Sequence, residues 1–134
     1  MGEIEGEYVE QVAILVHDER VSFDPERLAE LYTQLGEQAA EGAVCRALED
    51  MSIRLRRIEA AFWSRETEKV HENAVALVDV ADQIGMHTLS IVAKDVAVCI
   101  TRGDIVALGG TLARLLRVGD QSLSAIWDEQ TFAF

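Results

Sequence analysis

The segment His71-Glu-Asn-Ala-Val75-Ala-Leu-Val-Asp-Val-Ala-Asp-Gln-Ile-Gly85 has apolar residues three and four positions apart along its length. At about 100° per residue, this spacing gathers them on one side of an amphipathic helix. The side predicted to face a protein core comprises Val70, Ala74, Leu77, Ala81 and Ile84. Gly85 follows the pattern at a position where glycine commonly ends a helix. A helix that buries one side needs other elements to pack against, so we expect a helical bundle.

The opposite side of the same helix carries valines among acidic residues. Val75 lies roughly 160° from Leu77 around the helix, so it is predicted to face solvent. The residues predicted to surround it are Glu68, His71, Glu72, Val78, Asp79 and Asp82. The solvent side of a helix is normally polar throughout. Either these valines are scattered surface residues of a common kind, or they dock a protein partner.

Start and stop residues divide the rest of the chain into further helices. Asp24-Pro25-Glu26 combines a capping aspartate, a proline suited to the first turn and an acidic residue near the positive end of the helix dipole. Gly36 can end this helix. Longer helices are predicted over residues 41–63, 67–84, 88–101 and 104–127. Because short connections imply antiparallel neighbours, the sequence predicts an all-α, up-down antiparallel four-helix bundle over residues 23–134, with one short additional helix at its start.

Residues 1–22 are predicted to form an amino-terminal arm outside the bundle. Tyr8-Val-Glu-Gln-Val-Ala-Ile-Leu-Val16 suits a short helix or a buried strand, and the periodicity of so short a run does not separate the two. The arm is expected to pack on the bundle or on a second copy of it.

Glycines in the last helix predict two irregularities. A glycine inside a helix costs roughly 1 kcal/mol relative to alanine, so a pair usually serves a close helix contact or a bend. Gly109-Gly110 therefore predicts a tight helix crossing, and Gly119 marks a second possible break.

Charge and composition exclude several classes of function. The chain of 134 residues has 24 acidic and 12 basic residues and a net charge of -12, and such a field repels nucleic-acid phosphates. The apolar run Val12–Val16 is too short to span a bilayer. The first residues are acidic, whereas a signal peptide opens with a basic region. We therefore expect a cytoplasmic protein that binds neither nucleic acid nor membrane.

The sequence offers no pattern for a metal, a cofactor or an enzymatic reaction. Cys45 and Cys99 stand alone within apolar runs, so they are predicted to be small buried residues and not zinc ligands. His17 and His87 lack partners at metal-ligand spacing and are predicted to be cap or surface residues. Neither a phosphate-binding loop nor a nucleophile elbow occurs.

The order of these features resembles histidine phosphotransfer (HPt) domains, the small bundles that carry a phosphoryl group between two-component signalling proteins. Phe23-Asp-Pro-Glu-Arg-Leu-Ala-Glu-Leu, then Leu35-Gly-Glu, is similar to the usual opening of these domains. Arg102-Gly-Asp104, between the last two helices, also fits their pattern. The resemblance covers about residues 23–126 and implies the same bundle.

The resemblance fails at the residues that would carry the chemistry. In the family, the phosphoaccepting histidine lies ten residues before a glycine and is followed by leucine, lysine and glycine; ten residues before Gly85 stands Val75. Leu77 matches the leucine, whereas Val78 replaces the lysine and Asp79 replaces the glycine. The resemblance therefore implies a fold kept for binding after transfer was lost.

The resulting hypothesis is a non-catalytic binding module that docks a response-regulator receiver domain or a histidine kinase through the solvent side of the 67–84 helix. Two alternatives stay open. His71 lies one turn before Val75, a shift of about 6 Å, and would be the phosphoacceptor of an active relay protein. Alternatively, the arm and the exposed valines form a homodimer.

Overall fold

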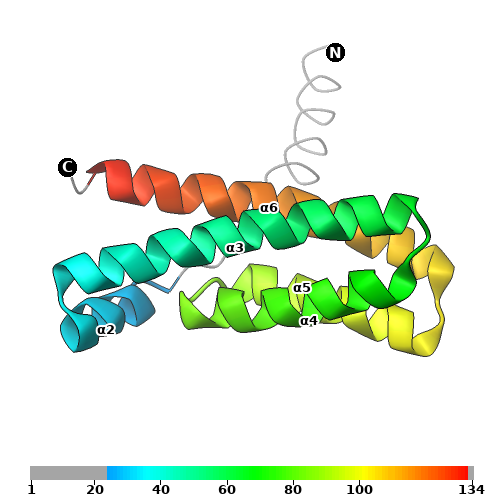
Figure 1. Ribbon diagram of the computed structural model, residues 1–134, viewed down its shortest axis with the longest axis horizontal. Helices are drawn as coiled ribbons and strands as arrows, with labels where there is room; N and C mark the ends of the chain where they lie inside the picture. Colours follow the sequence, from blue (N-terminus) through cyan, green and yellow to red (C-terminus); the bar gives the residue numbers. More distant parts are fainter. Residues whose placement is uncertain (1–23, 133–134) are drawn as a thin grey trace, which may run out of the picture.

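The structure, a computed structural model, describes the backbone of residues 24–132 and the side chains of residues 24–126 (Figure 1). The described part is helical, with no strand, and its helices are α2 (Pro25–Leu35), α3 (Glu37–Trp63), α4 (Thr67–Gln83), α5 (His87–Arg102) and α6 (Ile105–Phe132). The all-α prediction is therefore confirmed. The predicted arm of residues 1–22 and His17 lie outside the described residues.

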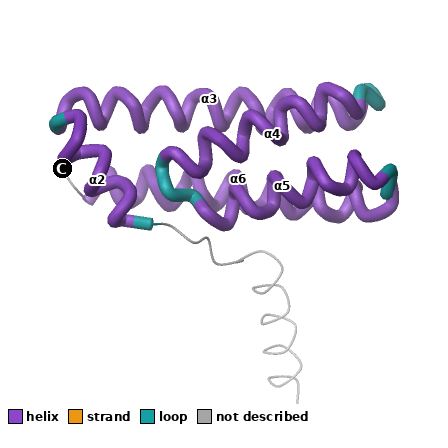
Figure 2. The backbone as a smooth tube through the Cα atoms, turned by 90° about the horizontal axis from the view of Figure 1, so that it is seen from below, coloured by secondary structure: helices purple, strands orange, loops and turns teal. Residues whose placement is uncertain are grey.

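Helices α3 to α6 run up and down, each antiparallel to the next, and α6 returns beside α3 to close the bundle (Figures 1 and 2). Helix α2 is short and packs on the start of α3. The core between them is aliphatic, and its largest fully buried side chains include Met51, Ile58, Leu77, Leu89 and Leu115. This arrangement is the predicted four-helix bundle with one additional helix.

Helix ends follow the capping residues of the sequence. The Asp24 carboxylate accepts a hydrogen bond from the Glu26 N–H at 3.0 Å, and Asp104 accepts one from the Ala107 N–H at 3.0 Å. The second helix begins at Glu37, four residues before the predicted start at Glu41. The reason is that Gly36, with φ of 82°, turns the chain by itself, so no longer linker is needed.

The prediction for the glycines of α6 was wrong. A Cβ at Gly109 or Gly110 would meet nothing within 4 Å, so no helix crosses closely there. The close approach is at Gly119, where a Cβ would lie 2.6 Å from a methyl group of Leu55 on α3, and α6 continues through this residue without a break. Gly110 lies on the outer side of α6 and Gly119 is buried on its core side, which decides which glycine meets a neighbour.

Contacts with the α4–α5 turn hold α2 in place. The Asp24 N–H donates to the Gly85 carbonyl at 3.0 Å, and the Arg27 Nε donates to the Gln83 carbonyl at 2.9 Å. Gly85 has φ of 77°, which admits the chain reversal. His87, an exposed residue as predicted, lies 3.3 Å from the Asp24 carboxylate, and this hydrogen bond lowers the pKa of Asp24.

The cysteine prediction was wrong for one of the two residues. Cys99 is half-buried, and its sulfur lies 3.6 Å from the Thr111 hydroxyl. Cys45 is exposed, because the apolar residues around it in the sequence turn to a different side of α3.

None of the helices in the described range is both long and apolar enough to cross a membrane.

Candidate partner-binding face

Helix α4 divides its residues between core and solvent as the periodicity predicts. Val70, Ala74, Leu77 and Ala81 are fully buried against the neighbouring helices. Val75, at the midpoint of α4 on the opposite side, is 44% exposed. The predicted orientation of this valine is therefore confirmed, and an aliphatic side chain occupies the outward midpoint of the helix.

Two neighbours of Val75 are less exposed than the helical periodicity suggested. His71 is half-buried, and Val78 is partly buried and packs against the core. On one side of α4, Asn73 contacts Arg54 of α3. His71 and Val78 lie on the opposite side, which turns toward α5. A helix in a bundle is flanked on two sides, so its solvent side is narrower than the helical periodicity alone suggests.

Acidic residues complete the surface around Val75. Glu72, Asp79 and Asp82 are exposed, as is Glu68 one turn before His71. We call the six residues predicted from the sequence the α4 face: His71, Glu72, Val75, Val78, Asp79 and Asp82. It combines apolar carbon at its centre and along one edge with negative charge elsewhere.

A polar cluster that the sequence analysis missed holds α4 against α3. The Arg54 guanidinium donates to the Asn73 side-chain carbonyl at 3.0 Å and to the Asp50 carboxylate at 3.3 Å. The Asn73 amide in turn donates to the Lys69 backbone carbonyl at 2.8 Å. Asn73 is only 7% exposed, and an asparagine on the core flank of an amphipathic helix was the signal that such a partner exists. The cluster sets how α4, and hence the α4 face, lies on the bundle.

A shallow pocket of about 460 Å³ adjoins this cluster between α3 and α4. Its lining residues are Arg54, Arg57, Glu66, Lys69, Glu72 and Asn73. Glu66 and Lys69 pair with each other at 3.4 Å, and Glu72 belongs to the α4 face. The basic edge of the pocket therefore lies directly beside the acidic face.

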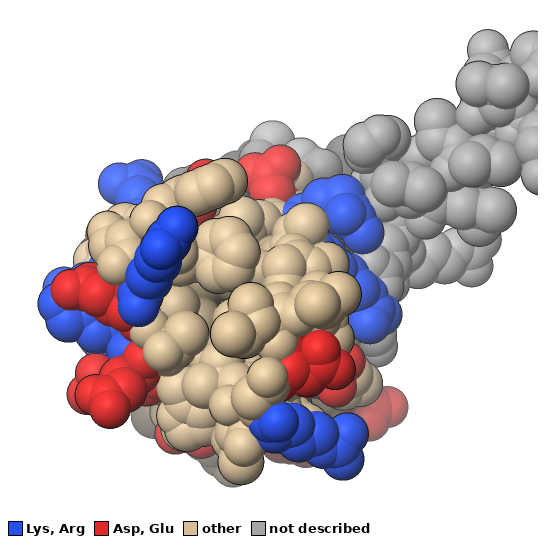
Figure 3. Space-filling model, turned by 90° about the vertical axis from the view of Figure 1, so that its right-hand side faces the viewer, with Lys and Arg blue, Asp and Glu red and all other residues tan. Residues whose placement is uncertain are grey.

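A second exposed apolar surface lies at the end of the bundle where α3 meets α4 and α5 meets α6. Trp63, Ile105 and Val106 are exposed there, Val106 by 91%. Figure 3 shows this end as uncharged residues ringed by charged residues of both signs. Apolar residues at helix ends lie outside the periodic pattern, so the sequence analysis did not identify this surface.

The α4 face lacks a nucleophile at its centre. A valine side chain has no lone pair, so it cannot accept a phosphoryl group at the position where the family resemblance places the histidine. Within residues 24–126, no group of three or more His, Cys, Asp or Glu side chains is arranged to hold a metal ion. The arrangement suits contact with a protein surface.

Comparison with known proteins identifies the fold. No protein-family model matches the sequence, and no curated protein matches it. The structure is similar to the crystal structure of histidine-containing phosphotransfer protein B (HptB) from Pseudomonas aeruginosa PAO1, with a TM-score of 0.75 over 84% of this chain and 96% of that chain. The chain has the HPt fold. Sequence identity to HptB is 16%, so the HPt fold is present here with a largely different sequence.

Proposed function

We propose that this protein is a non-catalytic HPt-like binding module in two-component signalling, which docks a receiver domain or a histidine kinase through the α4 face. The observation that carries the proposal is the exposed Val75 at the outward midpoint of α4. The HPt fold supports a partner of this class, since HptB, with the same fold, is described as a phosphotransfer protein.

The α4 face has the physical properties of a modest docking surface. Val75 presents apolar area that a partner can remove from water, and Val78 extends this area toward α5. The carboxylates of Glu72, Asp79 and Asp82 would steer a basic partner surface toward it and favour one orientation. They would also repel a phosphoryl group, which further disfavours transfer at this place.

A phosphotransfer assay tests the absence of catalysis. The full-length protein is incubated with receiver domains carrying a radiolabelled aspartyl phosphate, and histidine labelling is detected by its lability in acid. We expect no label on the protein. Acid-labile label would contradict the proposal, and its loss in a His71→Ala variant would assign it to the alternative acceptor.

His71 as phosphoacceptor is the second candidate because this residue belongs to the α4 face and is half-buried, not fully enclosed. Phosphoryl transfer depends almost entirely on positioning. A shift of one helical turn, about 6 Å, moves the acceptor nitrogen out of line with an aspartyl phosphate docked at Val75. The hypothesis of a non-catalytic binding module is therefore preferred over that of a relay protein phosphorylated on His71.

A binding assay tests the docking face. Receiver domains and kinase fragments are screened against the immobilised protein, and those that bind are measured again with Val75→Asp. The matched control is Val98→Asp on α5, since Val98 is 43% exposed and Val75 is 44% exposed. Val106→Asp controls for the exposed end of the bundle. We expect only Val75→Asp to weaken binding, by more than about tenfold, because burying an unpaired carboxylate costs more than 1.4 kcal/mol.

Equal loss of binding in the Val98 or Val106 variant would place the contact elsewhere. The homodimer alternative is separated by sizing the protein over a range of concentrations. A molecular mass that doubles with concentration, and that returns to the monomer value in Val75→Asp, would favour self-association through the α4 face.

A further inference from the structure

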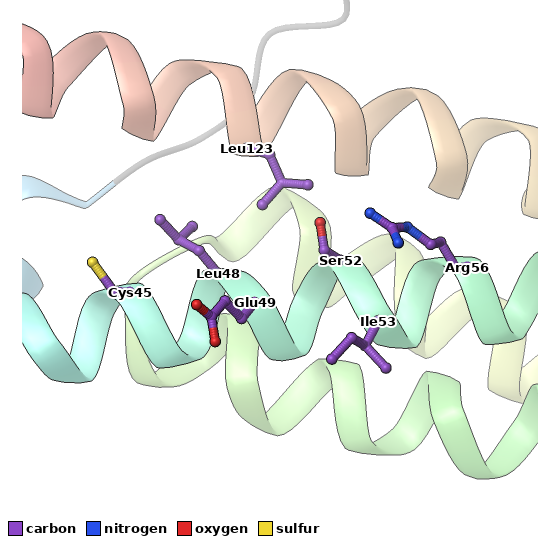
Figure 4. A pocket seen from close by; sticks show the side chains of 7 residues that line it. All are labelled: Cys45, Leu48, Glu49, Ser52, Ile53, Arg56 and Leu123. Carbon is purple, nitrogen blue, oxygen red and sulfur yellow. The ribbon is translucent and has the colours of Figure 1, made fainter.

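A groove between α3 and α6 has no partner among the residues that the structure describes. It has a volume of about 410 Å³ and is lined by Cys45, Leu48, Glu49, Ser52, Ile53, Arg56 and Leu123 (Figure 4). Ile53 is 44% exposed there, and Leu123 projects toward α3 from α6. An apolar groove of this kind between two helices fits an amphipathic segment laid along it.

The groove lies next to a close contact between α3 and α6. At Gly119 the missing side chain lets α6 approach Leu55 on α3. Leu123 lies one turn further along α6, and Cys45 to Ser52 lie toward the same end of α3. The residues that line the groove are therefore nearer the end of the bundle that holds the α4–α5 turn (Figure 1).

One basic and one acidic side chain line the groove, Arg56 and Glu49. Arg54 and Arg57 of the same helix line the pocket on its α4 side instead. The segment before Asp24 is strongly acidic, with glutamates at positions 3, 5, 7, 10 and 19 and an aspartate at 18, against one arginine at 20. A glutamate of this segment can meet Arg56 in the groove, and such a pair favours one orientation of the segment.

The same segment has apolar residues at the spacing that a groove between helices accepts. Val9, Val12 and Val16 are three and four positions apart, so they share one side when the chain is helical. Glu7 precedes these valines and Glu10 lies between Val9 and Val12, and both glutamates can remain in water.

The point of attachment allows the segment to reach the groove. The Asp24 backbone is hydrogen-bonded to Gly85, which follows the end of α4. The number of residues from the start of α4 to Gly85 equals the number from Cys45 to the end of α3. Because α3 and α4 are antiparallel neighbours, Asp24 and the groove are level along the bundle. The seven residues 17–23 span up to about 23 Å when extended, enough to pass round one helix about 10 Å across.

We propose that residues 8–16 of the same chain bind in the α3–α6 groove, with the valines against Leu48, Ile53 and Leu123 and Glu10 beside Arg56. This contact is separate from the α4 face and independent of the proposed signalling function. The bound segment would bury further apolar surface on the outside of the bundle, and it would cover the exposed thiol of Cys45.

Nuclear magnetic resonance of the full-length chain tests the contact. A nitroxide spin label is attached to Cys45 in a Cys99→Ser background, and amide intensities are compared before and after reduction of the label. We expect the resonances of residues 8–16 to lose intensity while the nitroxide is paramagnetic. The matched control carries the label at Lys94→Cys on α5 with both native cysteines replaced by serine, and there the same resonances should keep their intensity.

A mixed sample separates the two possible sources of the segment. Isotope-labelled chain without nitroxide is combined with unlabelled chain carrying it. Intensity loss in this mixture would show that a second copy supplies the segment, and it would overturn the proposal. Intact resonances in both samples would also overturn it, because the groove would then be empty.

Alkylation of the native Cys45 gives a measurement without a bulky label. We expect iodoacetamide to modify Cys45 several-fold faster in a Val12→Asp chain than in the unsubstituted one, since the charge would expel the segment. Equal rates would contradict the proposal even if the spin label had disturbed the groove. Ser124→Asp, an exposed change on α6, serves as the control for added charge.

Discussion

Gly85→Ala should destabilise the protein by distorting the turn that holds α2. Gly85 has φ of 77°, a left-handed conformation that costs a non-glycine residue about 1–2 kcal/mol. An added Cβ would also lie 2.9 Å from the Arg27 Cβ and 3.1 Å from the Asp24 backbone oxygen. These atoms are close to the backbone and cannot rotate away, so α2 itself must move.

The size of the effect follows from these two causes. Moving α2 weakens the hydrogen bond from the Asp24 N–H to the Gly85 carbonyl, which contributes about 1 kcal/mol. Together with the backbone cost, the free energy of unfolding should fall by about 2–3 kcal/mol. Gly103→Ala is the matched control, because Gly103 has φ of 69° and nothing within 4 Å of its added Cβ. That variant should lose only the backbone contribution of about 1–2 kcal/mol.

Urea unfolding followed by circular dichroism measures both variants under the same conditions. The midpoint should fall further for Gly85→Ala than for Gly103→Ala, while the dependence on urea concentration stays constant. Equal losses in the two variants would refute the reasoning, because they would mean that α2 does not constrain the turn.

Three further predictions concern the site and its support. Asn73→Ala removes the hydrogen-bond acceptor of the half-buried Arg54 guanidinium and should lower the free energy of unfolding by about 2–3 kcal/mol in the same urea assay. A loss smaller than that of an ordinary surface substitution would show that the Arg54–Asn73 cluster does not stabilise the fold. The triple variant Val75→His, Val78→Lys, Asp79→Gly restores the family motif and should acquire acid-labile label from a phosphorylated receiver; a folded variant that stays unlabelled would show that more than these positions was lost. The pKa of Asp24 is lowered below its ordinary value of 3.8, chiefly by its hydrogen bond with an imidazole, so this carboxylate contributes stability above that pH and loses it as the pH falls through the folded-state pKa. Urea midpoints measured from neutral to acid pH should therefore fall less steeply for Asp24→Asn than for the unsubstituted chain, and parallel curves would contradict this.

Helix content, order and direction could be predicted from local patterns. Capping residues such as Asp24 and Asp104 act within one turn of the chain, so their effect is visible without the fold. The periodicity of residues 70–84 likewise fixed which side of α4 is buried and left Val75 outside. The absence of the motif histidine is a fact of sequence alone.

Features that need two helices could not be predicted. The close contact at Gly119 depends on Leu55, which lies on a different helix, and the periodicity of α6 shows only that Gly119 is on the core side, not which side chain it meets. The exposure of Cys45 and the partial burial of His71 depend in the same way on where the neighbouring helices lie.

The amino-acid sequence by itself determined that this chain forms amphipathic helices. It also determined that one of them has an outward-facing valine at the position where HPt domains have a histidine. Tertiary structure alone decided how wide the α4 face is, which polar groups hold α4 against α3, and where a groove remains between α3 and α6. The physical reason is that hydrogen bonding and capping act between residues near in the chain, whereas burial and close packing depend on residues that only folding brings together.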